Sequence, residues 1–118
     1  MIRQGDVYWI NLRKPVGSAP GYRRPFIVVQ NDAFNASRIR TVVVCALTTN
    51  LARSDAPGNV LIKKGEAGLS GDSVINITQI ATVDKSQLMD RAGRVPPSRL
   101  LAAIKGINLL VTPSNPFQ

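Results

Sequence analysis

Two short runs of apolar, mostly β-branched residues constrain the fold of this chain more than any other feature. The runs occupy residues 26–29 and 41–47, and both are flanked by residues that favour turns. Branched side chains pack well on a pleated sheet, whereas their rotamers are restricted in a helix. We therefore expect two buried strands. The first would carry Arg24 at its mouth, and the second would present the hydroxyl groups of Thr48 and Thr49 at its end.

The rest of the sequence predicts further short strands joined by loops. Residues 73–83 alternate between apolar and polar, apart from a local break at Gln79, which predicts a strand with one buried face. The density of glycine and proline predicts a loop over residues 13–21. Other strands are expected at 7–12 and 60–62, a brief strand or bend at 92–95, loops or turns at 51–59 and 68–72, and single helical turns after Asp32 and Asp84 as N-caps.

Towards the end of the chain, the spacing of apolar residues changes from two to three or four. A helix is expected from about residue 97, and Pro113 ends it. One face of this helix is formed by Leu100, Ile104, Ile107 and Val111. Many strands followed by one helix predict a single domain over residues 1–118, mainly β with minor α: a half-open β-barrel with a C-terminal helix.

The charge balance bounds the kind of partner. The 118 residues include 15 Lys and Arg but 7 Asp and Glu, a formal charge of +8, which favours RNA, DNA or an acidic protein segment. The chain has no histidine, and its one cysteine, Cys45, falls inside an apolar run and is expected to be structural. A metal site and an intrachain disulfide are therefore not expected. No apolar stretch predicts a signal peptide or a membrane span, so we expect a cytoplasmic protein.

Several short motifs follow one another in an order shared with a known family. In chain order they are Gly5-Asp6 before an aromatic strand, Gly17-Ser18, Arg24-Pro25 before the first apolar run, Leu47-Thr48-Thr49, the turn from Gly68-Leu69 to Asp72-Ser73, and Gln79-Ile80. In this order the chain resembles the MazF/PemK-type toxins of type II toxin–antitoxin systems. The resemblance implies an SH3-like barrel, a homodimer, no cofactor, and metal-independent, sequence-specific cleavage of single-stranded RNA, whether mRNA, tRNA or rRNA.

The resemblance also implies roles for individual residues. Arg24 and Thr48 match the catalytic arginine and threonine of the family. The other expected RNA contacts are Gly17, Ser18, Tyr22, Arg23, Asn31, Thr49 and, as a base contact, Gln79. The chain departs from the family pattern at Ala19, Thr78 and Ala81. These departures bear on which RNA sequence is recognised and on which groups assist proton transfer. A MazE-like acidic antitoxin is the implied partner, and its complex with the toxin would bind promoter DNA.

The chemistry of RNA cleavage suits this set of residues. The 2′-OH of RNA is itself a nucleophile, so the protein has to stabilise a phosphorane-like transition state and assist proton transfer. Arg24 offers phosphate oxygens a planar, permanently charged fork, and Thr48 would position the 2′-OH or a phosphate oxygen. The general base stays open, because the chain has no histidine. Trp9 and Phe26 are expected in the core, whereas Tyr22 is a candidate for stacking on a base.

A second class of function fits the same pattern. A non-catalytic toxin or binding module of this fold, such as a gyrase poison or an RNA-binding SH3-like protein, would share the basic charge and the barrel. Cleavage of single-stranded RNA in the presence of a metal chelator distinguishes the enzyme from such a binder.

Overall fold

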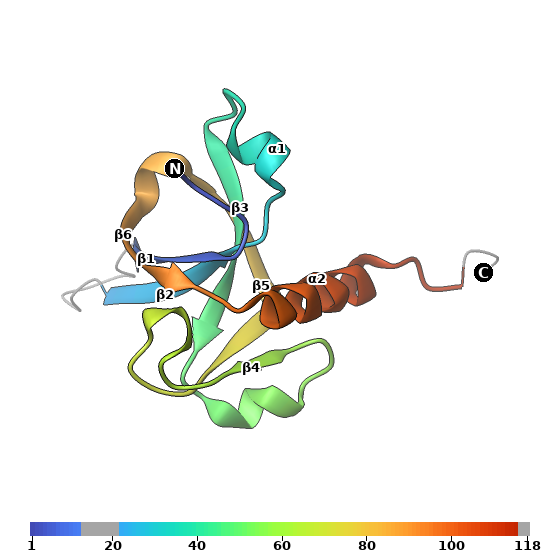
Figure 1. Ribbon diagram of the computed structural model, residues 1–118. Coiled ribbons are helices and arrows are strands. Elements are labelled where there is room, and N and C mark those ends of the chain that lie inside the picture. Colours follow the sequence, from blue (N-terminus) through green and yellow to red (C-terminus); the bar gives the residue numbers. More distant parts are fainter. Residues whose placement is uncertain (13–21, 116–118) are drawn as a thin grey trace, which may run out of the picture.

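The computed structural model describes residues 1–12 and 22–115, which form six antiparallel strands in one sheet (Figure 1). The strand order is β4-β5-β3-β2-β1-β6. None of the helices in these two ranges is long and apolar enough to cross a membrane. In chain order the elements are β1 (Asp6–Leu12), β2 (Tyr22–Val28), α1 (Asp32–Asn35), β3 (Thr41–Thr48), the 3₁₀-helix η1 (Leu51–Asp55), β4 (Val60–Ile62), η2 (Glu66–Gly68), β5 (Ser73–Asp84), η3 (Lys85–Gln87), β6 (Leu88–Arg94) and α2 (Pro97–Val111).

Alternate residues of the central strands enter two apolar clusters, one on each face of the sheet. In β3, Val44 and Ala46 join the first cluster, whereas Cys45 and Leu47 join the second. The first cluster draws its buried residues from β1, β2 and β3, and side chains at the end of β5 and the start of β6 pack against it. The sheet therefore curls around this cluster, which gives the half-open barrel that the sequence predicts. Long alternating strands supply this arrangement, because successive side chains point to opposite faces.

Helix α2 closes the second cluster by packing against β4 and β5. Its buried line is made of two small residues, Ala103 and Gly106. A Cβ atom on Gly106 would overlap the carbonyl oxygen of Gly58, so the absence of a side chain allows this close approach. Because the buried face is centred on these two residues, Val111 projects away and is exposed, contrary to its predicted place on the buried face.

Several boundaries differ from the predicted ones, and β6 (Leu88–Arg94) is longer than the strand or bend predicted at 92–95. β2 begins at Tyr22, so Arg24 lies within the strand, opposite Ile10 of β1, rather than at its mouth. The N-cap of α1 is Asn31, one residue before the predicted Asp32, because the Asp32 carboxylate instead accepts the N–H of Gln4 at 2.7 Å. The expected loop over 51–59 contains η1, whose first turn is capped by Asn50. In each case a side-chain contact or strand pairing extends or shifts regular structure.

The buried carboxylate of Asp6 links β1 to β6 through two arginine side chains. Its Oδ1 accepts from Arg91 Nη2 at 3.1 Å and from Arg94 Nη1 at 3.3 Å, and its Oδ2 accepts the backbone N–H of Arg3 at 3.1 Å. A buried carboxylate is tolerated when charge and hydrogen bonds compensate its lost hydration, as they do here. These contacts position β6, whose Asp90 pairs with Arg23 of β2.

Cys45 provides a test of the buried sheet. Burial raises the pKa of its thiol from an ordinary 9.0 to about 11. The unfolded chain therefore loses this proton first as the pH rises above about 9, and the free energy of unfolding should fall between about pH 9 and 11. At pH 8 a maleimide should label the native protein far more slowly than the protein in concentrated urea. Equal labelling rates in the two conditions would contradict the buried position.

Candidate active site

The site lies where β2 and β3 separate. Their pairing runs from Val28 opposite Val44 to Phe26 opposite Ala46 and ends there. The next residue of β2 is Pro25, which has no N–H for a ladder and is typical of places where a strand loses a partner. The side chains on either side of this opening therefore face a pocket rather than a neighbouring strand.

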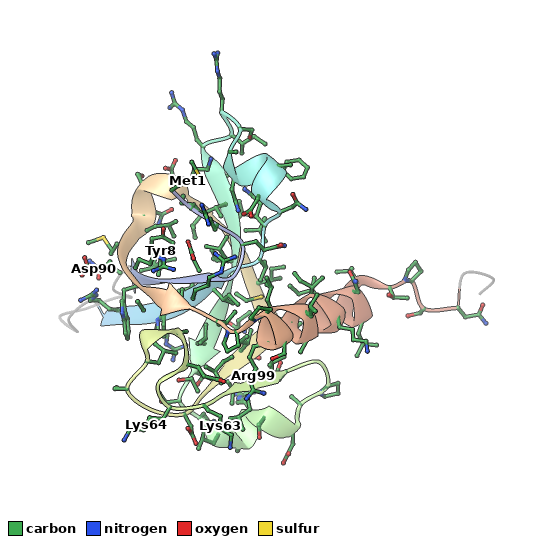
Figure 2. The ribbon with its side chains drawn as sticks, viewed as in Figure 1. Met1, Tyr8, Lys63, Lys64, Asp90 and Arg99 are labelled. Carbon is green, nitrogen blue, oxygen red and sulfur yellow. The ribbon has the colours of Figure 1, made fainter. Side chains whose placement is uncertain are left out.

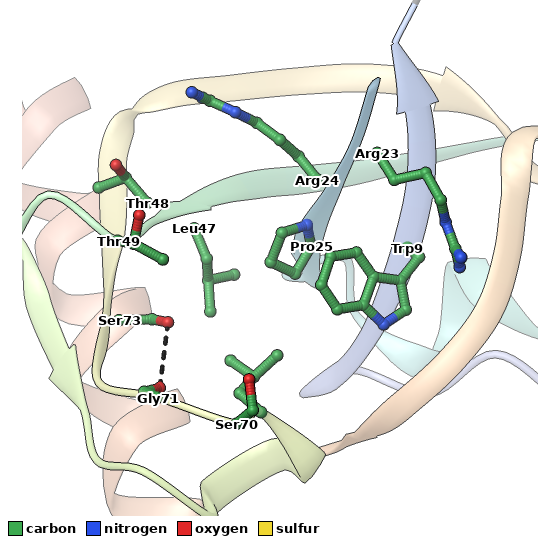
Figure 3. Close-up of a pocket in the computed structure, with 11 residues that line it drawn as sticks. Trp9, Arg23, Arg24, Pro25, Leu47, Thr48, Thr49, Ser70, Gly71 and Ser73 are labelled. Atoms are coloured by element: carbon green, nitrogen blue, oxygen red, sulfur yellow. Dashed lines mark hydrogen bonds between the residues drawn. The ribbon is translucent and has the colours of Figure 1, made fainter. Parts of the chain in front are cut away.

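The pocket has a volume of about 360 Å³ and is bordered by four segments of the chain (Figure 3). This volume is in the range of small-ligand sites. Its lining residues are Trp9 from β1, Arg23, Arg24 and Pro25 from β2, Leu47, Thr48 and Thr49 from the end of β3, and Leu69, Ser70, Gly71 and Ser73 from the segment that leads into β5. The pocket thus combines a cationic and hydroxyl-bearing part with an aromatic and apolar part.

Arg24 and Thr48, the two predicted catalytic residues, line this same pocket. Figure 3 shows the exposed side chain of Arg24 extending to the side on which Thr48 and Thr49 lie. The hydroxyl oxygen of Thr48 accepts the backbone N–H of Asn50 at 3.1 Å. Since a hydroxyl also carries one donor, this bond fixes the oxygen and leaves its proton to be donated to an acceptor in the pocket.

Arg23 contacts Trp9 at the rim of the pocket. The guanidinium carbon of Arg23 lies 5.3 Å from the centroid of the Trp9 ring, within the range of a cation–π contact. Its Nη2 atom donates to Oδ2 of Asp90 on β6 at 3.1 Å, and Asp90 lies at the outer side of the barrel (Figure 2). The two paired side chains are 48% and 85% exposed, so the ion pair adds little stability but orients Arg23 across the indole.

Only some of the other predicted RNA contacts lie at the pocket. Thr49 and Arg23 line the pocket, but Asn31 and Gln79 do not. Asn31 lies beyond the far end of β2, where its Oδ1 accepts the N–H of Ala33 at 2.8 Å as the cap of α1. Gln79 is exposed on β5, where the β3–β5 pairing changes register. Gly17, Ser18 and the side chain of Tyr22 lie outside the described residues.

Sequence reasoning missed part of the pocket. Trp9 was expected in the core, yet it is only half-buried and lines the site, whereas Phe26 is in the core as expected. Ser70 and Ser73 were not singled out, although they belong to the turn before β5 that is one of the family landmarks. The sequence pattern does not distinguish Trp9 from a core residue; its place at the pocket follows from its pairing with Pro25 across β1 and β2.

Within residues 1–12 and 22–115, no group of three or more His, Cys, Asp or Glu side chains could hold a metal ion. The polar side chains of the pocket are guanidinium and hydroxyl groups, which suit anions better than they suit cations. The polar side chains of the pocket therefore suit an anion, and an apolar part adjoins them.

The model of the PemK-like, MazF-like toxins of type II toxin–antitoxin systems matches residues 3–111. The chain belongs to this family. Among its relatives, a protein named endoribonuclease MazF6 from Mycobacterium tuberculosis is 41% identical over 107 residues, 91% of this chain and 94% of the relative. The endoribonuclease EndoA of Bacillus subtilis is 38% identical over 91 residues, 77% of this chain and 78% of the relative.

Solved structures agree with the PemK/MazF assignment. A mycobacterial endoribonuclease in complex with its cognate antitoxin matches with a TM-score of 0.77 and 26% identity, over 97% of this chain and 99% of that one. The MazE–MazF complex of Deinococcus radiodurans has the same fold, with a TM-score of 0.76 and 22% identity over 96% and 97% of the two chains. The predicted family and the half-open barrel are confirmed, and the names of the relatives support the predicted endoribonuclease.

Proposed function

We propose that this protein is a toxin that cleaves single-stranded RNA at a selected sequence, without a metal ion, and so arrests translation and growth in the cytoplasm. The observation that carries the proposal is the pocket shared by Arg24 and Thr48, which come from two neighbouring strands. Relatives named endoribonucleases, up to 41% identical over 91% of the chain, support it independently. Its RNA target is mRNA, tRNA or rRNA.

The cleavage step follows from the chemistry of RNA and the residues of the pocket. The 2′-oxygen attacks the adjacent phosphorus, the P–O5′ bond breaks, and the products are a 2′,3′-cyclic phosphate and a 5′-hydroxyl. The 2′-OH loses a proton and the 5′-oxygen gains one, so protons and charge balance. No nucleophile from the protein is needed, which fits a pocket whose polar side chains are arginine, threonine and serine.

Arg24 would stabilise the negative charge of the transition state, and Thr48 would position a phosphate oxygen or the 2′-oxygen. A guanidinium donates two parallel hydrogen bonds to phosphate oxygens, and these strengthen as negative charge accumulates on the phosphorane. The Thr48 oxygen is fixed by the Asn50 N–H, so its proton is directed to a phosphate oxygen or to the 2′-oxygen. A water molecule would supply the proton transfer that neither side chain provides at neutral pH.

A direct test is to incubate a long RNA with the protein in a metal chelator and to map the cuts. Cleavage at a short, recurring sequence in single-stranded regions is the expected result. An intact RNA would instead favour a binding module of the same fold, and the same assay defines the sequence preference if cleavage occurs.

We also expect a homodimer. The described structure leaves large apolar side chains of α2 exposed, with Leu101 at 70%, Leu109 at 62% and Val111 at 66%. Large apolar side chains left exposed on one helix favour an interaction site. Light scattering at micromolar concentration should give twice the mass of the 12.7 kDa chain. A monomer mass at that concentration would contradict the prediction.

The proposed regulator is an acidic, partly disordered antitoxin segment that occupies the RNA site. The charge of +8 and the exposed Arg23 and Arg24 attract a run of Asp and Glu as they attract phosphates, and the antitoxin complex would bind promoter DNA. Such a peptide and an uncleavable RNA should compete, and the affinity for RNA should fall with salt by a log–log slope of roughly 0.7 per neutralised phosphate. The test is to titrate the peptide into protein that is saturated with uncleavable RNA. If the peptide binds with undiminished affinity, the two sites are separate and the proposed inhibition is wrong.

A further inference from the structure

The pocket extends beyond the groups that cleavage requires. Arg24, Thr48 and Thr49 account for one part of it. The remaining part is bounded by Trp9, Pro25 and Leu69, with Ser70, Gly71 and Ser73 along one side (Figure 3). Leu69 and Ser73 are only 6% and 4% exposed, so they form the floor of this part, whereas Ser70 is exposed at its edge.

We propose that this second part, called here the base subsite, binds one nucleobase adjacent to the scissile phosphate, and that Trp9, Ser70 and Ser73 contribute to the choice of base. The inference rests on the proposed function, because it assumes that the phosphate lies at Arg24. It differs from the expectation drawn from the family resemblance, in which Gln79 contacts a base; Gln79 lies outside the pocket.

The side chains of the base subsite are complementary to the surfaces of a nucleobase. A base has flat apolar faces, which pack on aromatic and proline surfaces, and a polar edge, which needs hydrogen-bond partners. Trp9 and Pro25 supply the former, and the serine hydroxyls, each both a donor and an acceptor, supply the latter. Ser73 is buried whereas Ser70 is exposed, so Ser73 should discriminate more strongly, because a base that cannot pair with a buried hydroxyl leaves it without a partner.

Two contacts involve side chains of the base subsite before RNA binds. The Ser73 hydroxyl lies 3.4 Å from the Gly71 carbonyl oxygen, to which it donates a long and therefore weak bond that a base edge could replace. On the opposite wall, the contact of Arg23 with the Trp9 ring and its ion pair with Asp90 keep the indole in place. The Ser73 hydroxyl can thus exchange its partner for a base edge, while the Trp9 ring keeps its contact with Arg23.

Trp9 is the one tryptophan of the chain, so its fluorescence reports directly on the base subsite. The probe is a single-stranded 2′-fluoro decamer of randomised sequence, which lacks the nucleophile and is not cleaved. Its control is an abasic decamer with the same number of phosphates. We expect the first to quench Trp9 with the midpoint that anisotropy gives for binding, and the second to bind without quenching. Binding of the base-bearing decamer without quenching, equal quenching by the abasic one, or no binding of either would overturn the inference.

A second experiment tests the serines through cut-site preference. Wild type, Ser70→Ala and Ser73→Ala are given an RNA pool with randomised positions, and Ser98→Ala, which changes an exposed serine at the start of α2, is the matched control. Loss of one hydrogen bond should reduce the preference at one position about fivefold while other positions keep theirs. An unchanged preference in both variants, with unfolding curves like that of wild type, would overturn the assignment, as would a change produced by Gln79→Ala alone.

The two experiments separate this inference from the proposed function. If the wild-type protein cleaves no RNA, the proposed function fails, and the fluorescence titration still decides whether a base binds against Trp9. If the wild-type protein cleaves RNA but neither serine alters the preference, the proposed function stands and the base subsite is wrong.

Discussion

Replacing Arg24 by alanine is expected to reduce RNA cleavage by at least about 10²-fold while the protein stays folded. Removal of a single preorganised donor to a developing oxyanion costs about this much in enzymes of known mechanism. Arg24 is exposed, and its side chain lines the pocket rather than an apolar cluster, so thermal unfolding should change little. Single-turnover cleavage of a fluorescent RNA, together with an unfolding curve, measures both quantities.

Two companion variants make the Arg24 result interpretable. Arg24→Lys keeps the positive charge but loses the planar fork, so it should also cleave poorly. Arg38→Ala removes an equal charge from an exposed position before β3 and outside the pocket, so it should cleave almost normally. Near-normal cleavage by Arg24→Ala, or an equal loss in Arg38→Ala, would show that Arg24 contributes only to the general basic charge.

Replacing Gly106 by alanine should destabilise the protein by about 1–3 kcal/mol, the usual cost of overpacking a core. Helix propensity alone predicts the opposite sign, since alanine is favoured over glycine in a helix by about 1 kcal/mol. The structure decides between them: a Cβ atom on Gly106 would overlap the Gly58 carbonyl oxygen and lie 3.0 Å from Cγ1 of Ile77. Urea denaturation provides the measurement.

Asn108→Ala is the matched control for Gly106, because it introduces alanine at an exposed position of the same helix. There propensity acts without steric conflict, so stability should stay the same or rise by about 0.5 kcal/mol. A Gly106→Ala variant as stable as Asn108→Ala would mean that α2 does not pack closely on the turn that contains Gly58.

The regular elements were largely predictable because their side-chain periods are unambiguous. The strand over 73–84 forms, but its predicted buried face is limited to the first half, because residues 78–82 are all exposed; residues 97–111 form the expected helix. The start of β2 was missed for a physical reason: Pro25 reads as a strand breaker, although the strand continues through it by pairing with β1 alone. Likewise, the exposed Val111 follows from contacts of Gly106 with a distant turn, which periodicity cannot show.

The sequence predicted which cation and hydroxyl groups belong to the candidate site, but it did not predict the apolar residues of the site. Arg24 and Thr48 precede and end the two central runs, so a sequence reading places them near each other. Trp9 and Ser70 are separated by 61 positions of chain and meet only because β1 and the segment before β5 border the same opening. Hydrophobic pattern assigns a tryptophan in a strand to the core, and only the tertiary arrangement turns it towards a pocket.

Cleavage of RNA at the Arg24–Thr48 pocket is proposed to proceed through attack by the 2′-OH. The most direct measurement uses a short RNA containing the mapped cut site and a twin with a single 2′-deoxy nucleotide on the 5′ side of the cut, both in chelator. We expect the first RNA to be cleaved to a 2′,3′-cyclic phosphate and a 5′-hydroxyl, and the twin to stay intact. Cleavage of the twin at the same bond, or a 5′-phosphate product, would contradict this mechanism.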